Sequence, residues 1–307
     1  MHTRKALILI SVFLMLLLIC AGAIFVLSRV RQPEAIRLNT YPSTEPTVVK
    51  VAPVSAVIWG DSGSGDSTQI QTADAIASYC GSAYCDYGVI AGDVIYPSGV
   101  SSVTDPQFAS KFEKPYQALN FPIYIAFGNH DYLGCTSCYL EYGNQSSKWR
   151  MPASYYTESL SADLSLFVID TENFDTAQQQ WLTQALGLSS AKWKVVVGHK
   201  PILTYESTHH AETWPGQDKL AEIVCHKAQL YISGHSHALE DLGKLASCDV
   251  NLLVSGGGGG EKREMINGNP DLFSSILNGF LSIKAGTGLS FSFTDSGGKT
   301  LYTAELP

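Results

Sequence analysis

Short apolar runs and amphipathic stretches alternate along most of this chain. Runs rich in Val, Ile and Leu predict buried β-strands, and stretches whose apolar residues recur every three or four positions predict helices. The predicted strands are residues 54–59, 87–91, 123–126, 166–169, 194–197, 229–232 and 252–254. The predicted helices are residues 68–79, 105–119, 176–186 and 217–225. Strands that alternate with helices are typical of an α/β core that contains parallel strands.

The end of the chain follows a different pattern. Residues 279–283, 288–293 and 300–306 predict three strands without helices between them, and Gly297-Gly298 predicts the last turn. Such strands indicate an antiparallel meander. A mixed sheet, or two packed sheets with helices outside, accommodates both patterns, so the predicted class is α/β with α+β character.

The N-terminal residues do not fit this folded pattern. Residues 6–27 form an unbroken apolar stretch that is long enough for a helix to cross a bilayer core of roughly 30 Å. A cleaved export signal usually has only about 7–15 apolar residues, but the small residues Ala21-Gly22-Ala23 leave cleavage open. Residues 29–50, with prolines among polar residues, predict a linker. We therefore expect a membrane anchor or signal at 1–28 and one folded domain at 51–307, anchored or secreted.

Cysteine usage bears on the compartment. Apart from Cys20, the chain has six cysteines in three local pairs, an even count typical of disulfides in an exported domain. A structural zinc site built on Cys135-x-x-Cys138, or reduced buried pairs, are the alternatives. The preferred pairing joins neighbours, namely Cys80 with Cys85, Cys135 with Cys138 and Cys225 with Cys248. We accordingly place the domain outside the cytoplasm.

The net charge of the chain and the distribution of its basic residues bear on which kinds of partner it can bind. The formal net charge is -8, and only 16% of the residues are charged. A nucleic-acid surface normally needs a basic stripe to neutralise phosphates, and the chain has none in its folded part. We therefore expect no nucleic-acid partner.

Metal-capable side chains follow five of the predicted strands, each after a glycine. Each motif alone is also typical of a turn or a helix cap, but five such strand ends in this order predict a metal site. In open α/β sheets, side chains at the carboxyl ends of strands converge, and glycine lets the backbone approach closely. The motifs are Gly60-Asp61, Gly92-Asp93, Gly128-Asn129, Gly198-His199 and Gly234-His235-Ser236-His237.

This ordered set, with Tyr96 three residues after Asp93, resembles the calcineurin-like metallophosphoesterases. More narrowly, it resembles the small tartrate-resistant type of purple acid phosphatase. Residues 105–113, 147–156 and 180–182 also resemble that type, so the similarity spans about 51–307. The resemblance implies a four-layer sandwich of two mixed β-sheets flanked by helices.

The resemblance also implies a division of the metal ligands. A ferric ion would be bound by Asp61, Tyr96 and His237, a divalent ion by Asn129, His199 and His235, and Asp93 would bridge the two. Carboxylate and phenolate oxygens favour Fe(III), whereas imidazole and amide ligands suit Fe(II), Zn or Mn. In this family, charge transfer from the tyrosine to iron gives the purple colour. Ordinary packing of Tyr96 is the alternative.

Further residues are candidates for proton transfer. The implied mechanism is in-line attack by a metal-bound hydroxide without a phosphoenzyme. His130 resembles the family histidine that contacts phosphate or protonates the alcohol, and Asp131 is expected to orient its ring or to serve as a turn residue. His209 and His210 are candidate acids, with His209 preferred. Lys200 stands where the family often has an aromatic residue, which puts specificity in doubt.

The expected function is that of an exported acid phosphatase acting on small phosphate monoesters. Two alternatives stay open. One is a phosphodiesterase or nucleotide hydrolase of the same superfamily with Mn or Zn, and the other is a non-catalytic, membrane-anchored binding module.

Overall fold

Two seven-stranded mixed sheets lie at the centre of the computed structural model, which describes residues 53–266 and 272–306. The first sheet has the order β14-β13-β12-β1-β2-β3-β4 and the second has the order β11-β9-β10-β8-β7-β6-β5. The strands of the first sheet are β1 (Val54–Trp59), β2 (Tyr87–Ala91), β3 (Ile123–Ala126), β4 (Trp149–Arg150), β12 (Gly279–Ala285), β13 (Leu289–Asp295) and β14 (Thr300–Leu306). Those of the second are β5 (Tyr156–Ser159), β6 (Leu164–Val168), β7 (Trp193–Val197), β8 (Leu230–Ser233), β9 (Leu239–Lys244), β10 (Asn251–Ser255) and β11 (Phe273–Ser275).

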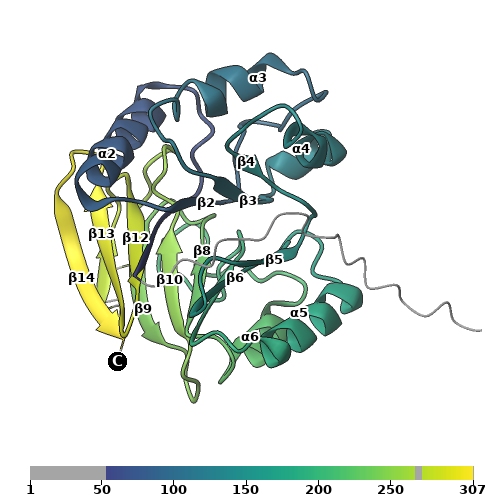
Figure 1. The fold of residues 1–307 in the computed structure, drawn as a ribbon, viewed down its shortest axis with the longest axis vertical. Coiled ribbons are helices and arrows are strands. Elements are labelled where there is room, and N and C mark those ends of the chain that lie inside the picture. Colours follow the sequence, from purple (N-terminus) through teal and green to yellow (C-terminus); the bar gives the residue numbers. More distant parts are fainter. Residues whose placement is uncertain (1–52, 267–271, 307) are drawn as a thin grey trace, which may run out of the picture. The chain divides into compact units, whose positions relative to one another are not determined.

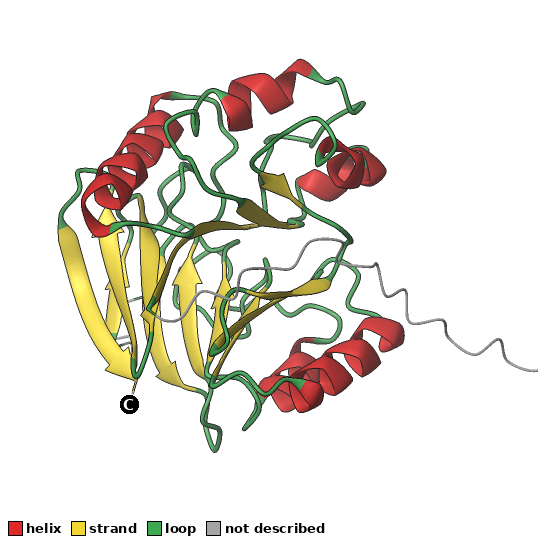
Figure 2. Cartoon of the chain, viewed as in Figure 1, coloured by secondary structure: helices red, strands yellow, loops and turns green. Residues whose placement is uncertain are grey.

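Helices cover the outer faces of both sheets, as Figures 1 and 2 show. Helices on the side of the first sheet are α2 (Ser67–Ala83), α3 (Pro106–Phe108) and α4 (Thr136–Tyr142). On the side of the second sheet lie α5 (Thr176–Leu188) and α6 (Gln217–Val224). This arrangement of helices, sheet, sheet and helices confirms the expected four-layer sandwich.

Alternate side chains of β7 show why its sequence is continuously apolar. Val195 and Val197 belong to the large core that includes both sheets, whereas Val196 packs in a second core with residues of α5 and α6. A strand buried on both faces has no polar side, so it appears as an uninterrupted apolar run. The predicted strands and meander were found at or within two residues of their expected positions.

The helix predicted over residues 105–119 is wrong. A short helix over Pro106–Phe108 is followed by a π-helical turn over Ala109–Glu113, where the Lys114 N–H donates to the carbonyl of Ala109. Pro115 has no N–H to donate to the carbonyl of Lys111, which accepts a bond from the Gln69 side chain at 2.7 Å instead. The segment therefore leaves the regular helical path before its predicted end.

The three predicted disulfides are present. The sulfur–sulfur distances are 1.99 Å for Cys80–Cys85, 2.05 Å for Cys135–Cys138 and 1.96 Å for Cys225–Cys248. The zinc interpretation of these cysteines is therefore wrong, and the bonded pairs indicate an oxidising compartment. Residues 6–27 lie outside the described part of the chain. Across 53–266 and 272–306, none of the helices has both the length and the apolar character needed to span a bilayer.

Candidate metal centre

The five motif-bearing strand ends meet where the two sheets face each other. β1, β2 and β3 are parallel neighbours in the first sheet, and β7 and β8 are parallel neighbours in the second. Two contacts join the sheets at this point: the His235 N–H donates to Asp61 Oδ2 at 2.8 Å, and His199 Nδ1 lies 2.9 Å from the carbonyl oxygen of Ala91. Side chains from both sheets therefore converge on one small volume.

The backbone is strained at three of the proposed ligands. Asp61, Asp93 and His235 have φ angles of 58°, 52° and 66°, in the left-handed region that non-glycine residues rarely adopt. Each such residue costs roughly 1–2 kcal/mol. Strain of this kind persists where surrounding structure holds a side chain in a required direction, and it is typical of functional sites.

Glycines beside the ligands make room for this convergence. A Cβ atom at Gly92, which has φ +83°, would lie 2.4 Å from His199 Nδ1, and one at Gly128 would lie 2.2 Å from Asp93 Oδ1. Neither position tolerates a side chain without displacing a ligand. The expected role of glycine at these strand ends is confirmed.

One half of the cluster consists of Asp61, Tyr96 and His237. The Tyr96 hydroxyl donates to Asp61 Oδ1 at 3.1 Å and lies 3.2 Å from His237 Nε2. His237 Nε2 is 3.7 Å from Asp61 Oδ1. Two oxygens and one nitrogen thus surround a common point, which is the set expected for a ferric ion.

The other half consists of Asn129, His199 and His235. Asn129 Oδ1 lies 3.0 Å from both His199 Nε2 and His235 Nδ1, and these two nitrogens are 3.2 Å apart. Asp93 lies between the halves: its Oδ2 is 3.5 Å from His199 Nε2, and its negative charge helps to raise the pKa of Tyr96. The structure thus brings together all seven expected ligands in the two predicted groups.

The charges of this cluster fit a bound cation. Burial raises the pKa of Asp61 to about 8, and it raises the pKa of Tyr96 well above its ordinary value. Burial opposes the charged form of His199, but the neighbouring Asp93 carboxylate raises its pKa to about 10. Asp61, Asp93 and His199 are all buried and could hold a metal ion. Because buried anions need a counter-charge, this donor set suits positively charged ions.

The ring nitrogens that face away from the cluster are also held. His237 Nδ1 lies 2.6 Å from the carbonyl oxygen of Glu261, and His235 Nε2 lies 2.8 Å from Glu212 Oε2. The bond with His235 is the main cause that lowers the pKa of Glu212 to about 2. Sequence reasoning missed Glu212, because nothing in its surroundings distinguishes it from any other acidic loop residue.

His130 lies beside the cluster, but Asp131 does not orient it. His130 Nδ1 is 2.6 Å from the carbonyl oxygen of Pro97, and its ring centroid is 4.5 Å from that of Tyr96. The expected orienting role of Asp131 is therefore wrong. Its buried carboxylate instead accepts bonds from the Tyr139 hydroxyl and from the backbone N–H groups of Val94, Ile95 and Gly128. It holds the loops after β2 and β3 together.

His209 and His210 differ in their relation to the cluster. The ring of His209 lies 4.1 Å from that of His235, and its Nδ1 is 2.6 Å from the buried Glu206. His210 is exposed, and its ring stacks on Tyr205. His209 is thus the one packed against a proposed ligand.

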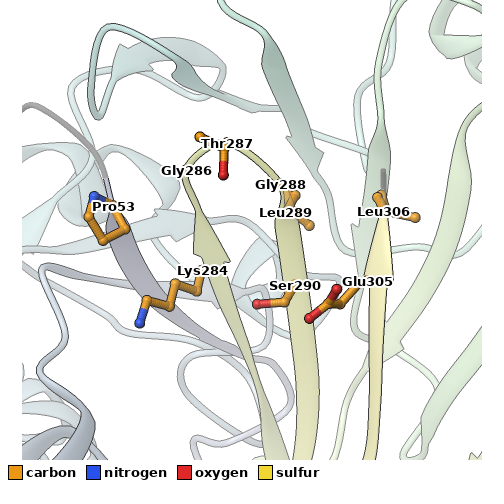
Figure 3. Close-up of a pocket in the computed structure, with 9 residues that line it drawn as sticks. All are labelled: Pro53, Lys284, Gly286, Thr287, Gly288, Leu289, Ser290, Glu305 and Leu306. Carbon is orange, nitrogen blue, oxygen red and sulfur yellow. The ribbon is translucent and has the colours of Figure 1, made fainter.

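Within the described part of the chain, cavities border the centre on two sides. A cavity of about 590 Å³ is lined by Tyr96, His130 and His237, and one of about 220 Å³ is lined by His209 and His235. A third cavity, of about 520 Å³, lies at the opposite ends of the strands (Figure 3). It is bordered by the residue before β1 and by the β12–β13 turn, and none of the proposed ligands lines it. Of these three cavities, which are lined by described residues, the first two lie where a substrate would reach the centre.

The chain is similar in sequence to known proteins. A family model described as calcineurin-like phosphoesterase matches residues 60–239. Purple acid phosphatase 4 of Arabidopsis thaliana is 31% identical over 250 residues, which cover 71% of this chain and 72% of that protein. Tartrate-resistant acid phosphatase type 5 of Sus scrofa is 23% identical, with 90% and 92% of the two chains covered.

Solved structures share the fold. GAP50, the anchor in the inner membrane complex of Plasmodium, superposes with a TM-score of 0.73 at 21% identity, covering 83% of this chain and 88% of its own. The purple acid phosphatase PPD1 from yellow lupin (Lupinus luteus) seeds gives a TM-score of 0.69 at 15% identity. That alignment covers 83% of this chain and 54% of the lupin chain, so this protein spans about half of the lupin enzyme.

Proposed function

Because the chain belongs to the calcineurin-like phosphoesterase family, we propose that it is an exported acid phosphatase that hydrolyses phosphate monoesters. The observation that carries the proposal is the position of Tyr96, whose hydroxyl lies within 3.2 Å of both Asp61 Oδ1 and His237 Nε2. If Tyr96 only filled space in the core, its hydroxyl would not need to lie beside two atoms that can bind a metal. The domain reaches its substrate from outside the cytoplasm, either tethered through residues 6–27 or released from them.

The donor set divides between two unlike ions. Fe(III) would be held by Asp61, Tyr96 and His237, a divalent Fe, Zn or Mn by Asn129, His199 and His235, and both by Asp93. When bound, such a pair supplies positive charge for a phosphate and a reactive nucleophile from water.

Neighbouring histidines provide the remaining polar groups. His130 borders the larger cavity, and its ring nitrogen Nδ1 is held by the Pro97 carbonyl. In this role its ring would contact a phosphate oxygen. His209 borders the smaller cavity. Its Nδ1 is engaged by Glu206, so its other ring nitrogen is the one available to give a proton to a departing alcohol.

The visible spectrum of the full-length protein tests the iron assignment. Protein purified from its own host should absorb in the visible range, and Tyr96→Phe should abolish the band because it removes the phenolate. Tyr302→Phe, on the outer strand β14, is the matched control and should leave the band intact. A colourless, iron-free protein that is fully active with Mn and indifferent to Tyr96→Phe would refute the assignment. It would favour a phosphodiesterase or nucleotide hydrolase instead.

A non-catalytic anchor is the second candidate. The fold similarity to GAP50 and the apolar residues 6–27 are compatible with it. The complete set of seven ligands favours catalysis over this candidate, because a binding module has no need to retain them. Hydrolysis of p-nitrophenyl phosphate by the metal-loaded protein at acid pH distinguishes the two, and undetectable turnover would favour the anchor.

A further inference from the structure

The two ring nitrogens of His235 face different environments. Nδ1 points into the cluster, 3.0 Å from Asn129 Oδ1, whereas Nε2 lies 2.8 Å from Glu212 Oε2. The ring is only 10% exposed. A carboxylate bond to the outward nitrogen is the arrangement that commonly fixes a metal-binding imidazole.

Glu212 is itself held by a lysine. Lys200 Nζ lies 3.6 Å from Glu212 Oε1 and 3.4 Å from Glu172 Oε2. The Lys200 side chain is 16% exposed, and its backbone is fixed because its N–H donates to Thr171 and its carbonyl accepts from Tyr231. Glu172, Lys200, Glu212 and His235 therefore form a continuous chain of polar contacts that ends at the cluster.

This chain of contacts determines which nitrogen of His235 carries the proton. An ionised carboxylate only accepts hydrogen bonds, so the proton resides on Nε2 and the lone pair of Nδ1 faces Asn129. Without Glu212, the ring could adopt the other tautomer or turn away.

We propose that Glu212 is a positioning residue that fixes the tautomer and plane of His235 and thereby sets the affinity of the divalent half for its ion, with Lys200 holding Glu212 in place. The proposal rests on the proposed function, in which His235 is a ligand. It also gives a role to Lys200, which pairs with Glu212.

A competing interpretation is a third metal site. His209, Glu212 and His235 each offer a ligand atom, and these atoms lie within 4.8 Å of one another. However, the 2.8 Å separation between Glu212 and His235 is that of a direct hydrogen bond, which a bound ion would replace. The number of divalent ions bound per chain distinguishes the two interpretations.

Zinc titration of the full-length protein tests the proposal. Protein that carries Fe(III) and lacks a divalent ion is titrated with zinc in competition with a chromophoric chelator. Glu212→Ala should weaken zinc binding roughly 10- to 100-fold, as removal of such orienting carboxylates does. Glu212→Gln, whose amide oxygen can still accept a bond, should weaken it less. The visible band should stay unchanged in both, because the ferric half does not contact Glu212.

Glu222→Ala is the matched control. Glu222 is a carboxylate on α6 that is 70% exposed and pairs only with Lys219 among the described residues, so its loss should leave zinc affinity unchanged. Lys200→Met should weaken zinc binding at least threefold, and it carries the test if Glu212→Ala does not fold. Equal zinc affinity in wild type and these variants, or a third ion bound in wild type, would overturn the proposal. If wild type takes up no divalent ion, the proposed function itself fails, and this inference with it.

Discussion

Replacing Gly128 by alanine tests how finely the structure positions Asp93. Gly128 precedes Asn129, and an added Cβ atom would lie 2.2 Å from Asp93 Oδ1 and 2.3 Å from its backbone nitrogen. Because Cβ contacts under 3.0 Å are essentially never seen, the two groups must separate by at least 0.8 Å (3.0 − 2.2). The nearest contacts include backbone, so the strain cannot be relieved by a side-chain rotation alone.

The expected loss follows from this displacement. A shift of about 1 Å in a catalytic group can cost on the order of 100-fold in rate. This factor corresponds to about 2.7 kcal/mol in the activation barrier. We therefore expect Gly128→Ala to lower kcat for p-nitrophenyl phosphate about 100-fold and to release part of the bound metal.

The assay pairs steady-state kinetics with metal analysis. Gly187→Ala is the control, since Gly187 is exposed in α5 and an added Cβ would meet nothing within 4 Å. Alanine there should leave kcat unchanged and favour the helix by about 1 kcal/mol. A Gly128→Ala protein with wild-type kcat and full metal content would refute the argument that close backbone approach sets the position of Asp93.

Three further outcomes are expected. His130→Ala should retain both metals by elemental analysis and lose turnover, because its ring packs edge-on against Tyr96 and is not among the proposed ligands. Loss of the metals would contradict this division of roles. Replacing Cys225 and Cys248 by serine should lower the free energy of unfolding by about 3.4 kcal/mol in a denaturant titration, because their bond closes a long loop; an unchanged midpoint would contradict the entropic argument. In the metal-free protein, Asp61 binds its proton more tightly when folded, with a pKa of about 8 against 3.8. Its contribution to stability is therefore full below pH 3.8 and is lost as the pH rises to about 8. Thermal melting should accordingly be lower at pH 8 than at pH 5, and bound metal should remove the difference.

Local sequence predicted the positions of most strands and of the proposed ligands. β1, β2, β3 and β14 begin and end at the predicted residues. For β1, β2 and β3, an apolar run followed within two residues by a glycine marks the strand and its end. The order of the ligand motifs was equally local. Each ligand follows its strand directly, so the parallel arrangement of the strands was enough to bring the side chains to one edge.

The sequence did not predict β9, because the contacts that allow its acidic residues to be buried come from elsewhere in the fold. Its sequence places Glu240 and Asp241 among apolar residues, which does not indicate a buried strand. The buried Glu240 carboxylate is satisfied by the Thr204 hydroxyl at 2.6 Å and the Tyr205 N–H at 2.9 Å. A buried charge is tolerated only where such partners exist, and these partners come from a distant loop.

The sequence by itself predicted an α/β core with a terminal meander and favoured disulfides between neighbouring cysteines, because each depends on composition and on near neighbours. The two-sheet sandwich and the division of the proposed ligands followed from the family resemblance of the motifs. Tertiary structure alone decided how the outer residues act. Asp131 was expected to bond the His130 ring, but it accepts hydrogen bonds from backbone N–H groups of the loop after β2 instead. Glu212 contacts His235, which lies 23 residues further along the chain. Hydrogen bonds depend on distances of a few tenths of an ångström between segments far apart in sequence. Only the packed fold sets those distances.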